Sequence, residues 1–196
     1  MKQAIFVMLD EYADWEGAYL SSQLNQSSDW EIKTASTTAE VTSIGGIRTK
    51  ITDKIADIPS DCELLILIGG NSWTIKNDQL KEVIARRLIT GKSVAAICGA
   101  VDYLAENGLL TGYKHTGNAQ YLWQNFAEYK NGTDFVSEDA VCCRNLVTAN
   151  GTAPLKFTEQ VLQMIKFKDN EQVTRDIDLY RLGFYKYCEK YGNPFV

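Results

Sequence analysis

The most reactive side chain that the sequence suggests is the thiol of Cys98. It follows an apolar run, residues 93–97, and precedes an amphipathic segment, residues 101–107. A strand that turns directly into a helix at a cysteine is a nucleophile elbow in thiol form, and the small neighbours Gly99 and Ala100 leave room for the sharp turn. Free N–H groups and the dipole at the start of the helix favour a thiolate, so we expect a lowered thiol pKa. The alternative is an inert cysteine in the core.

Polar residues and glycines follow the other predicted strands. In a parallel α/β sheet the carboxyl ends of the strands meet at one edge, where ligands bind. We expect the backbone N–H groups of Gly70 and Gly99 to form an oxyanion hole there, although Gly69-Gly70 also fits a plain tight turn. Four further residues near these strand ends are candidates for lining the pocket: Asn71, Trp73, Thr116 and Asn150.

Two side chains are candidates for handling the proton of the thiol. Glu16 begins a predicted helix, where a carboxylate is favoured by the helix dipole, but it could instead face the thiol as a protonated acid with a raised pKa. Asp10, Glu11 and Asp14 compete with it, and their spacing does not choose among them. His115 is the only histidine, so a Cys–His dyad within the chain must use it; the alternative is a structural histidine.

Composition excludes several classes of partner and cofactor. The net charge of −5 and the absence of a basic stripe argue against nucleic acid or an anionic membrane, and no apolar segment approaches membrane-spanning length. Five cysteines without framework spacing indicate a reducing compartment, so we expect a cytoplasmic protein. Cys142-Cys143 would lie on alternate faces of a strand, and no dinucleotide-binding loop is present; we therefore expect no metal and no cofactor.

Alternating strand-like and helix-like segments predict an α/β fold with a mostly parallel sheet, in one domain over residues 1–196. The predicted strands cover residues 3–9, 30–35, 64–68, 93–97 and 113–116, with hairpins over 41–51 and 135–149. The predicted helices cover residues 16–25, 78–90, 101–107, 118–126, 153–167 and 172–190. The tail, residues 168–196, is rich in tyrosine and phenylalanine. We expect it to cover the core, the alternative being the face of a homodimer.

These motifs, in this order, resemble the ThiJ/PfpI family of the class I glutamine amidotransferase-like superfamily. The resemblance spans residues 2–167 and rests on six segments: residues 14–16, 64–70, 95–100, 104–112, 115–118 and 146–153. It implies a flavodoxin-like three-layer sandwich, with Cys98 as nucleophile and Glu16 as its acidic partner. It also implies Gly70 and Gly99 as the oxyanion donors. Family proteases carry histidine directly after the nucleophile, whereas this chain has Gly99, so a catalytic histidine would have to be His115 or come from a neighbouring subunit.

Three functions compete on this evidence. The first is a cysteine-dependent hydrolase, of the protease or amidase kind, acting on a small amide, carbonyl or peptide substrate. The second is a non-catalytic redox or stress-response sensor in which Cys98 is oxidised to a sulfinic acid beside Glu16; a glyoxalase-like or deglycase-like activity is a further alternative that the family allows. The third is a ligand-binding module with an unreactive elbow.

Overall fold

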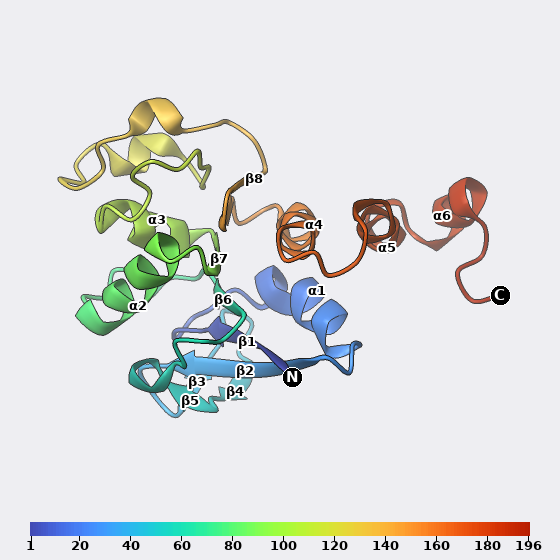
Figure 1. Ribbon diagram of the computed structural model, residues 1–196, viewed down its shortest axis with the longest axis horizontal. Coiled ribbons are helices and arrows are strands. Elements are labelled where there is room, and N and C mark those ends of the chain that lie inside the picture. Colours follow the sequence, from blue (N-terminus) through green and yellow to red (C-terminus); the bar gives the residue numbers. More distant parts are fainter.

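A seven-stranded sheet runs through the centre of the computed structural model, which describes residues 1–196 (Figure 1). The strand order is β5-β2-β1-β6-β7-β9-β8, and every pair is parallel except β8 with β9. The strands of this sheet are β1 (Lys2–Val7), β2 (Trp30–Ser36), β5 (Asp53–Lys54), β6 (Leu64–Leu67), β7 (Ser93–Ile97), β8 (Ala140–Cys143) and β9 (Leu146–Ala149). The predicted mostly parallel α/β sheet is confirmed.

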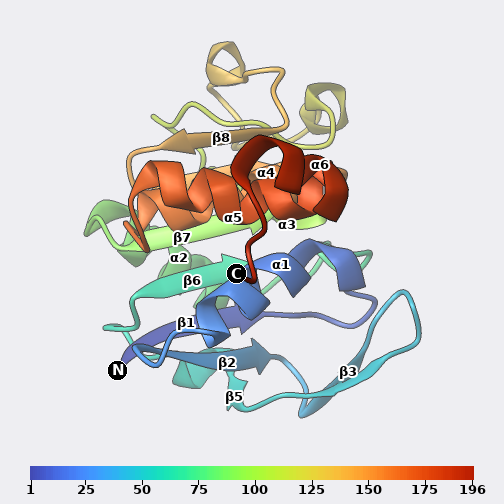
Figure 2. The same cartoon turned by 90° about the vertical axis from the view of Figure 1, so that its right-hand side faces the viewer.

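Helices cover both faces of the sheet, because the buried strands are apolar on both sides. The helices are α1 (Asp14–Asn25), α2 (Asp78–Ile89), α3 (Gly99–Glu106), α4 (Pro154–Met164), α5 (Asn170–Leu182) and α6 (Phe184–Tyr191). In β6, Leu65 and Leu67 join the core cluster that contains the apolar residues of α2 and α3, whereas Leu64 and Ile66 join the cluster of α1 and α4. Figure 2 looks onto the face covered by α1 and α4. This arrangement is the predicted three-layer sandwich.

Two predicted elements are wrong. Residues 113–116 form no strand and make only an isolated bridge between His115 and Phe135, and residues 118–126 contain only the short 3-10 helix η2 (Gln120–Trp123). The cause is tertiary packing, because the rings of His115, Trp123, Tyr129 and Phe135 lie against one another. The burial of these rings fixes the segment more strongly than its helical periodicity does.

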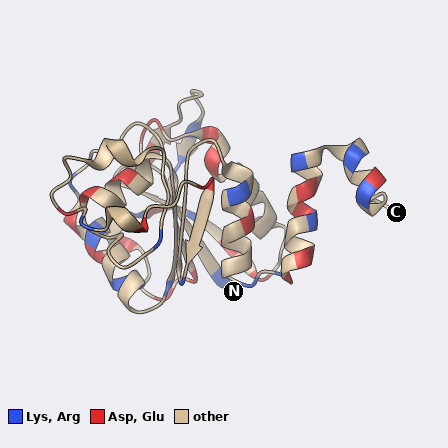
Figure 3. Ribbon diagram, turned by 90° about the horizontal axis from the view of Figure 1, so that it is seen from above, with Lys and Arg blue, Asp and Glu red and all other residues tan.

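Both predicted hairpins are confirmed, one by β3 (Glu40–Thr42) with β4 (Arg48–Lys50) and the other by β8 with β9. The expected last helix is instead divided at Gly183, whose φ of +78° lies in the left-handed region, so α5 and α6 are separate helices. Val173 of α5 is buried in the core cluster of α1 and α4. Figures 1 and 3 show α4, α5 and α6 in a row that leads away from the sheet, so α6 does not cover the core.

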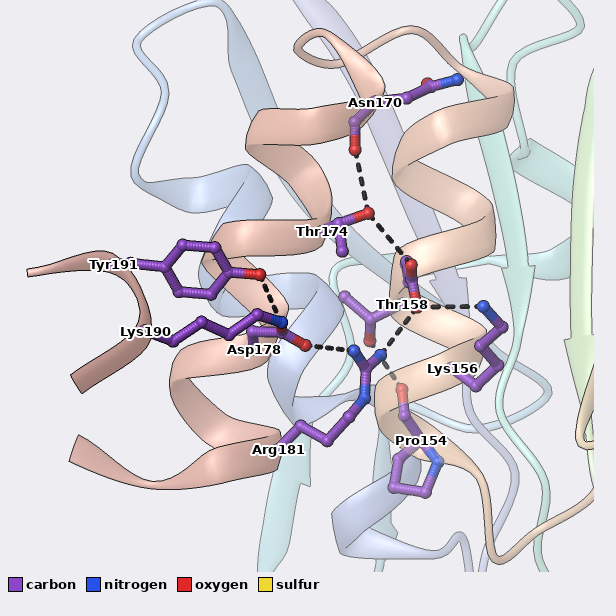
Figure 4. Close-up of polar contacts among 10 residues, drawn as sticks. Pro154, Lys156, Thr158, Asn170, Thr174, Asp178, Arg181, Lys190 and Tyr191 are labelled. Carbon is purple, nitrogen blue, oxygen red and sulfur yellow. Dashed lines mark hydrogen bonds and ion pairs between the residues drawn. The ribbon is translucent and has the colours of Figure 1, made fainter. Parts of the chain in front are cut away.

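The C-terminal helices are joined by ion pairs between buried carboxylates and exposed cations (Figure 4). Arg181 of α5 pairs with Glu159 of α4 at 2.7 Å and with Asp178, while Lys190 of α6 pairs with Asp178 at 3.0 Å. Burial on its own would raise the pKa of both carboxyl groups. Lys156 and Arg181 outweigh it at Glu159, and Tyr191, Lys190 and Arg181 outweigh it at Asp178, so both pKa values are lowered. None of the helices is long and apolar enough to cross a membrane.

We predict that Arg181→Met lowers the free energy of unfolding by about 2 kcal/mol in denaturant melts at pH 7. Loss of one partner of a fully buried pair costs about 3–5 kcal/mol, but water screens Arg181, which is partly exposed. Since both carboxyl pKa values are lowered by folding, this stabilisation is complete above about pH 5 and fades as pH falls through the folded-state values. Arg175→Met, which breaks the exposed pair with Glu171, is the control and should cost less than about 0.5 kcal/mol. Equal losses in the two variants would contradict the prediction.

Candidate active site

Cys98 lies at the turn between β7 and α3, as the elbow predicts. Its backbone has φ 59° and ψ −130°, a conformation that costs a non-glycine residue about 1–3 kcal/mol. The turn is held in place by the Cys98 N–H, which donates to the carbonyl of Ala149 on the neighbouring strand at 3.0 Å. The side chain is partly exposed, and its sulfur lies beside the first N–H groups of α3. The bend therefore presents the thiol at the carboxyl edge of the sheet.

Glu16 of α1 is the acidic residue that the fold brings to the thiol. It is completely buried, and its Oε2 accepts a hydrogen bond from the Gly69 N–H at 2.8 Å. Its Oε1 is also buried and receives no hydrogen bond from the rest of the chain, while the thiol of Cys98 is near enough to influence the carboxyl pKa. Of the competing acids, Asp10 and Asp14 accept hydrogen bonds from the backbone of the β3–β4 region, at Thr42 and Gly45. The structure therefore selects Glu16.

Two glycines make room for this carboxyl–thiol pair. A Cβ atom on Gly69 would lie 2.5 Å from both the Cys98 Cβ and the Glu16 Oε2, and one on Gly151 would lie 2.8 Å from Sγ and 3.0 Å from Oε1. Real Cβ atoms do not approach other atoms so closely. The backbone at both positions therefore closes around the pair, and no larger residue fits without displacing it.

Asn118 is the residue of the site that the sequence analysis did not select. Its Nδ2 donates to the Cys98 sulfur at 3.2 Å, and its Oδ1 accepts from the Gly151 N–H at 2.9 Å. It thus connects the sulfur to the loop after β9. The available signal was its place three residues after His115, in a segment that already pointed to the family.

The pKa values of the pair depend mainly on burial. Burial raises the pKa of Glu16 to about 7, although the neighbouring Cys98 thiol and the hydrogen bond from the Gly69 N–H oppose this. Burial also raises the pKa of the Cys98 thiol to about 11; Asn118 and the Gly99 N–H lower it, while Glu16 raises it further. The expectation of a raised Glu16 pKa is confirmed. The expectation of a lowered thiol pKa is wrong, because the donors around sulfur do not outweigh its burial beside an acid.

The two predicted oxyanion donors are close together. A Cβ on Gly99 would lie 2.6 Å from the Gly70 carbonyl oxygen, so the two backbone segments are in contact. Gly70 has φ +148° and lies opposite Tyr12 in an isolated bridge, where the N–H groups of Ala13 and Asn71 are used but that of Gly70 makes no backbone hydrogen bond. Gly99 begins α3, so its N–H is not used within the helix. The Gly70 N–H therefore has no backbone partner, whereas the Gly99 N–H faces the Cys98 sulfur and lowers its pKa.

His115 is not placed as a catalytic base. It is fully buried; its Nδ1 lies 2.8 Å from the Tyr113 carbonyl oxygen and its Nε2 lies 2.9 Å from the Tyr129 hydroxyl. Burial lowers the pKa of His115, which keeps the ring neutral. Both nitrogens have structural partners and neither bonds the sulfur. The predicted Cys98–His115 dyad is therefore wrong. His115 instead packs against the rings of Trp123, Tyr129 and Phe135.

The four predicted pocket residues separate into two groups. Thr116 and Asn150 line an open, polar groove of about 490 Å³, which Asn118 also lines. Trp73 is instead a buried core residue whose Nε1 donates to the Ile68 carbonyl, and Asn71 is exposed on the loop after Gly70. Asn118 connects this groove to the sulfur, because it lines the groove and its amide donates to Cys98.

Comparison with known proteins supports this description of the fold. The family model described as the DJ-1/PfpI family matches residues 2–164. The chain is 48% identical to "Uncharacterized protease YdeA" of Bacillus subtilis (strain 168) over 196 residues, all of both chains, and 36% identical to "Uncharacterized protease YoaZ" of the same organism over 78% of each. The crystal structure of a thiJ/pfpI family protein from Bacillus anthracis matches with a TM-score of 0.88 and 31% identity, covering 95% of this chain and 93% of that one. The chain belongs to the DJ-1/PfpI family.

Proposed function

We propose that the protein is a cysteine-dependent hydrolase that cleaves a small amide or a peptide with Cys98 as nucleophile. The observation that carries the proposal is the buried Glu16 carboxyl facing a partly exposed thiol at a strained turn. A nucleophile paired with a proton acceptor and neighbouring N–H donors is the arrangement that acyl transfer requires. The names of two relatives as proteases agree with this reaction class.

The chemical steps follow from the proton that the pair shares. After the first ionisation of the pair, near pH 7, one proton remains between Oε1 of Glu16 and Sγ of Cys98. With that proton on Oε1, the sulfur attacks the substrate carbonyl carbon, and the N–H groups of Gly70 and Gly99 stabilise the resulting oxyanion. As the C–N bond breaks, Glu16 gives its proton to the leaving amine. Water then attacks the thioester, and its proton returns to the Glu16–Cys98 pair as the acid product leaves.

A redox sensor is the second candidate, and Asn118 is the observation that favours it. An amide N–H and a carboxyl group that flank the sulfur could also hold the oxygens of a sulfinic acid. The homodimer, which is the alternative role of the C-terminal tail, and the cytoplasmic location stay predictions.

We predict that Cys98→Ala abolishes turnover of at least one member of a panel of amides, peptides and 2-oxoaldehydes that the wild type hydrolyses or converts. Cys142→Ala, which removes an exposed thiol, is the control and should retain full activity. Turnover of 2-oxoaldehydes alone would support glyoxalase-like chemistry. Complete lack of turnover, together with stoichiometric peroxide oxidation of Cys98, would replace the hydrolase by the sensor.

We predict that the rate of Cys98 alkylation by iodoacetamide rises with pH through a midpoint of about 7 in the wild type. The reason is that the pair loses its first proton near pH 7, and the remaining proton then exchanges between Sγ and Oε1. A fraction of the molecules therefore carries the thiolate far below the thiol pKa of about 11. Glu16→Gln removes that ionisation, so the step near pH 7 should disappear from the profile measured by peptide mapping. Glu11→Gln, on the exposed part of the same loop, should keep it. A wild-type rate that is already maximal well below pH 6 would contradict this assignment.

We predict that Asn118→Ala raises the pKa of the Cys98 thiol and slows its alkylation at pH 7 by about tenfold. A hydrogen bond to a charged group contributes about 1.5 kcal/mol, and the Asn118 amide is the side-chain donor to this sulfur. Asn71→Ala, on an exposed loop beside the site, serves as the control and should leave the rate unchanged. Unchanged alkylation in Asn118→Ala would show that the amide does not stabilise the thiolate.

A further inference from the structure

A second pocket lies at the edge of the sheet opposite Cys98. It has a volume of about 270 Å³ and is formed where the end of α2 meets the loop after the 3-10 helix η1 (Ile55–Asp57) and the residue before β7. Three cationic side chains line it: Arg86, Arg87 and Lys92. Because Lys92 precedes the start of β7 and Cys98 follows its end, this pocket and the proposed active site are at opposite ends of the same strand.

Arg87 is a buried charge without a carboxylate partner. Its side chain is only 3% exposed, and its two terminal nitrogens donate to the backbone carbonyls of Cys62, Glu63 and Ser93 and to the Cys62 sulfur. It forms no ion pair, and its Nε has no hydrogen-bond acceptor. A buried guanidinium that lacks a counter-charge is costly, and an anion in the adjoining pocket would offset that cost.

The other polar side chains of the pocket also favour a negatively charged ligand. Arg86 and Lys92 are exposed and make no ion pair, and the hydroxyl groups of Ser60 and Thr90 complete the polar lining. No acidic residue lines the pocket; the neighbouring acids Asp61 and Glu63 line a separate pocket beside Met1.

A simpler explanation of the basic residues is that they neutralise the negative end of the α2 helix dipole, since Arg86 and Arg87 belong to the last turn of α2. That helix end carries only about half a negative charge, whereas the pocket gathers three positive charges. Ile58, Pro59 and Val83 form apolar walls around these charges. A ligand that suits the pocket must therefore combine negative charge with a short apolar body.

We propose that this pocket binds a small organic carboxylate, with the carboxylate held by Arg86, Arg87 and Lys92 and the apolar body against Ile58 and Val83. The exposed guanidinium of Arg86 suits a carboxylate because it presents a planar pair of N–H donors. The terminal N–H groups of Arg87 are already bonded to Cys62, Glu63 and Ser93, so Arg87 contributes its positive charge and its unpaired Nε–H. This site is independent of the thiol chemistry at the other end of the strand.

The test is isothermal titration calorimetry of the full chain with sodium butyrate at low ionic strength. Saturable binding to one site is expected, and the double variant Arg86→Gln/Lys92→Gln should weaken it at least about tenfold, a change of about 1.4 kcal/mol. Both changed residues are exposed, so the fold should be preserved. Butylammonium, which has the same chain length and the opposite charge, should not bind.

A double variant with the same change of charge at another place provides the control. Arg48→Gln/Lys50→Gln alters two exposed cations of β4 and should leave butyrate binding unchanged. The proposal is overturned if the wild type does not bind butyrate at millimolar concentrations, if butylammonium binds equally well, or if both double variants lose affinity equally.

Discussion

The burial of the Glu16 carboxyl against the Cys98 thiol is the contact that most constrains this structure. It requires an acid at the first turn of α1, a cysteine at a backbone angle that side chains avoid, and glycines at positions 69 and 151. Each of these is locally unfavourable or restrictive, yet all of them meet at one point. When unfavourable and restrictive features gather at one edge of an otherwise regular sheet, that edge is typical of a site maintained for chemistry.

The fold supplies the rigidity that this contact needs. β7 is buried in the middle of the sheet, paired in parallel with β6 on one side and with β9 on the other. The loops after β6 and β9 therefore arrive at the sulfur from both neighbouring strands, carrying Gly69 and Gly151. The pairing of these strands fixes the positions of both loops. Helix α1 places the Glu16 carboxyl group at the same edge of the sheet.

Much of this was predictable from the sequence, and the failures have identifiable physical causes. The apolar runs and the turn at Cys98 are local signals, so the buried strands and the elbow could be placed in advance. The contact between Asn118 and the sulfur could not be predicted, because it depends on a side chain that reaches from an irregular segment to a distant strand. His115 was misassigned because sequence does not reveal that its two nitrogens are satisfied by Tyr113 and Tyr129. The thiol pKa was misjudged because the depth of burial is a three-dimensional quantity.

The positive φ of Cys98 exposes the thiol for reaction but lowers the stability of the fold. A glycine there would relieve the strain of the positive φ and remove the thiol from the turn, so selection for thermal stability alone would erode the site. Among the most heat-stable clones from a random library, we therefore expect inactive variants that carry glycine at position 98.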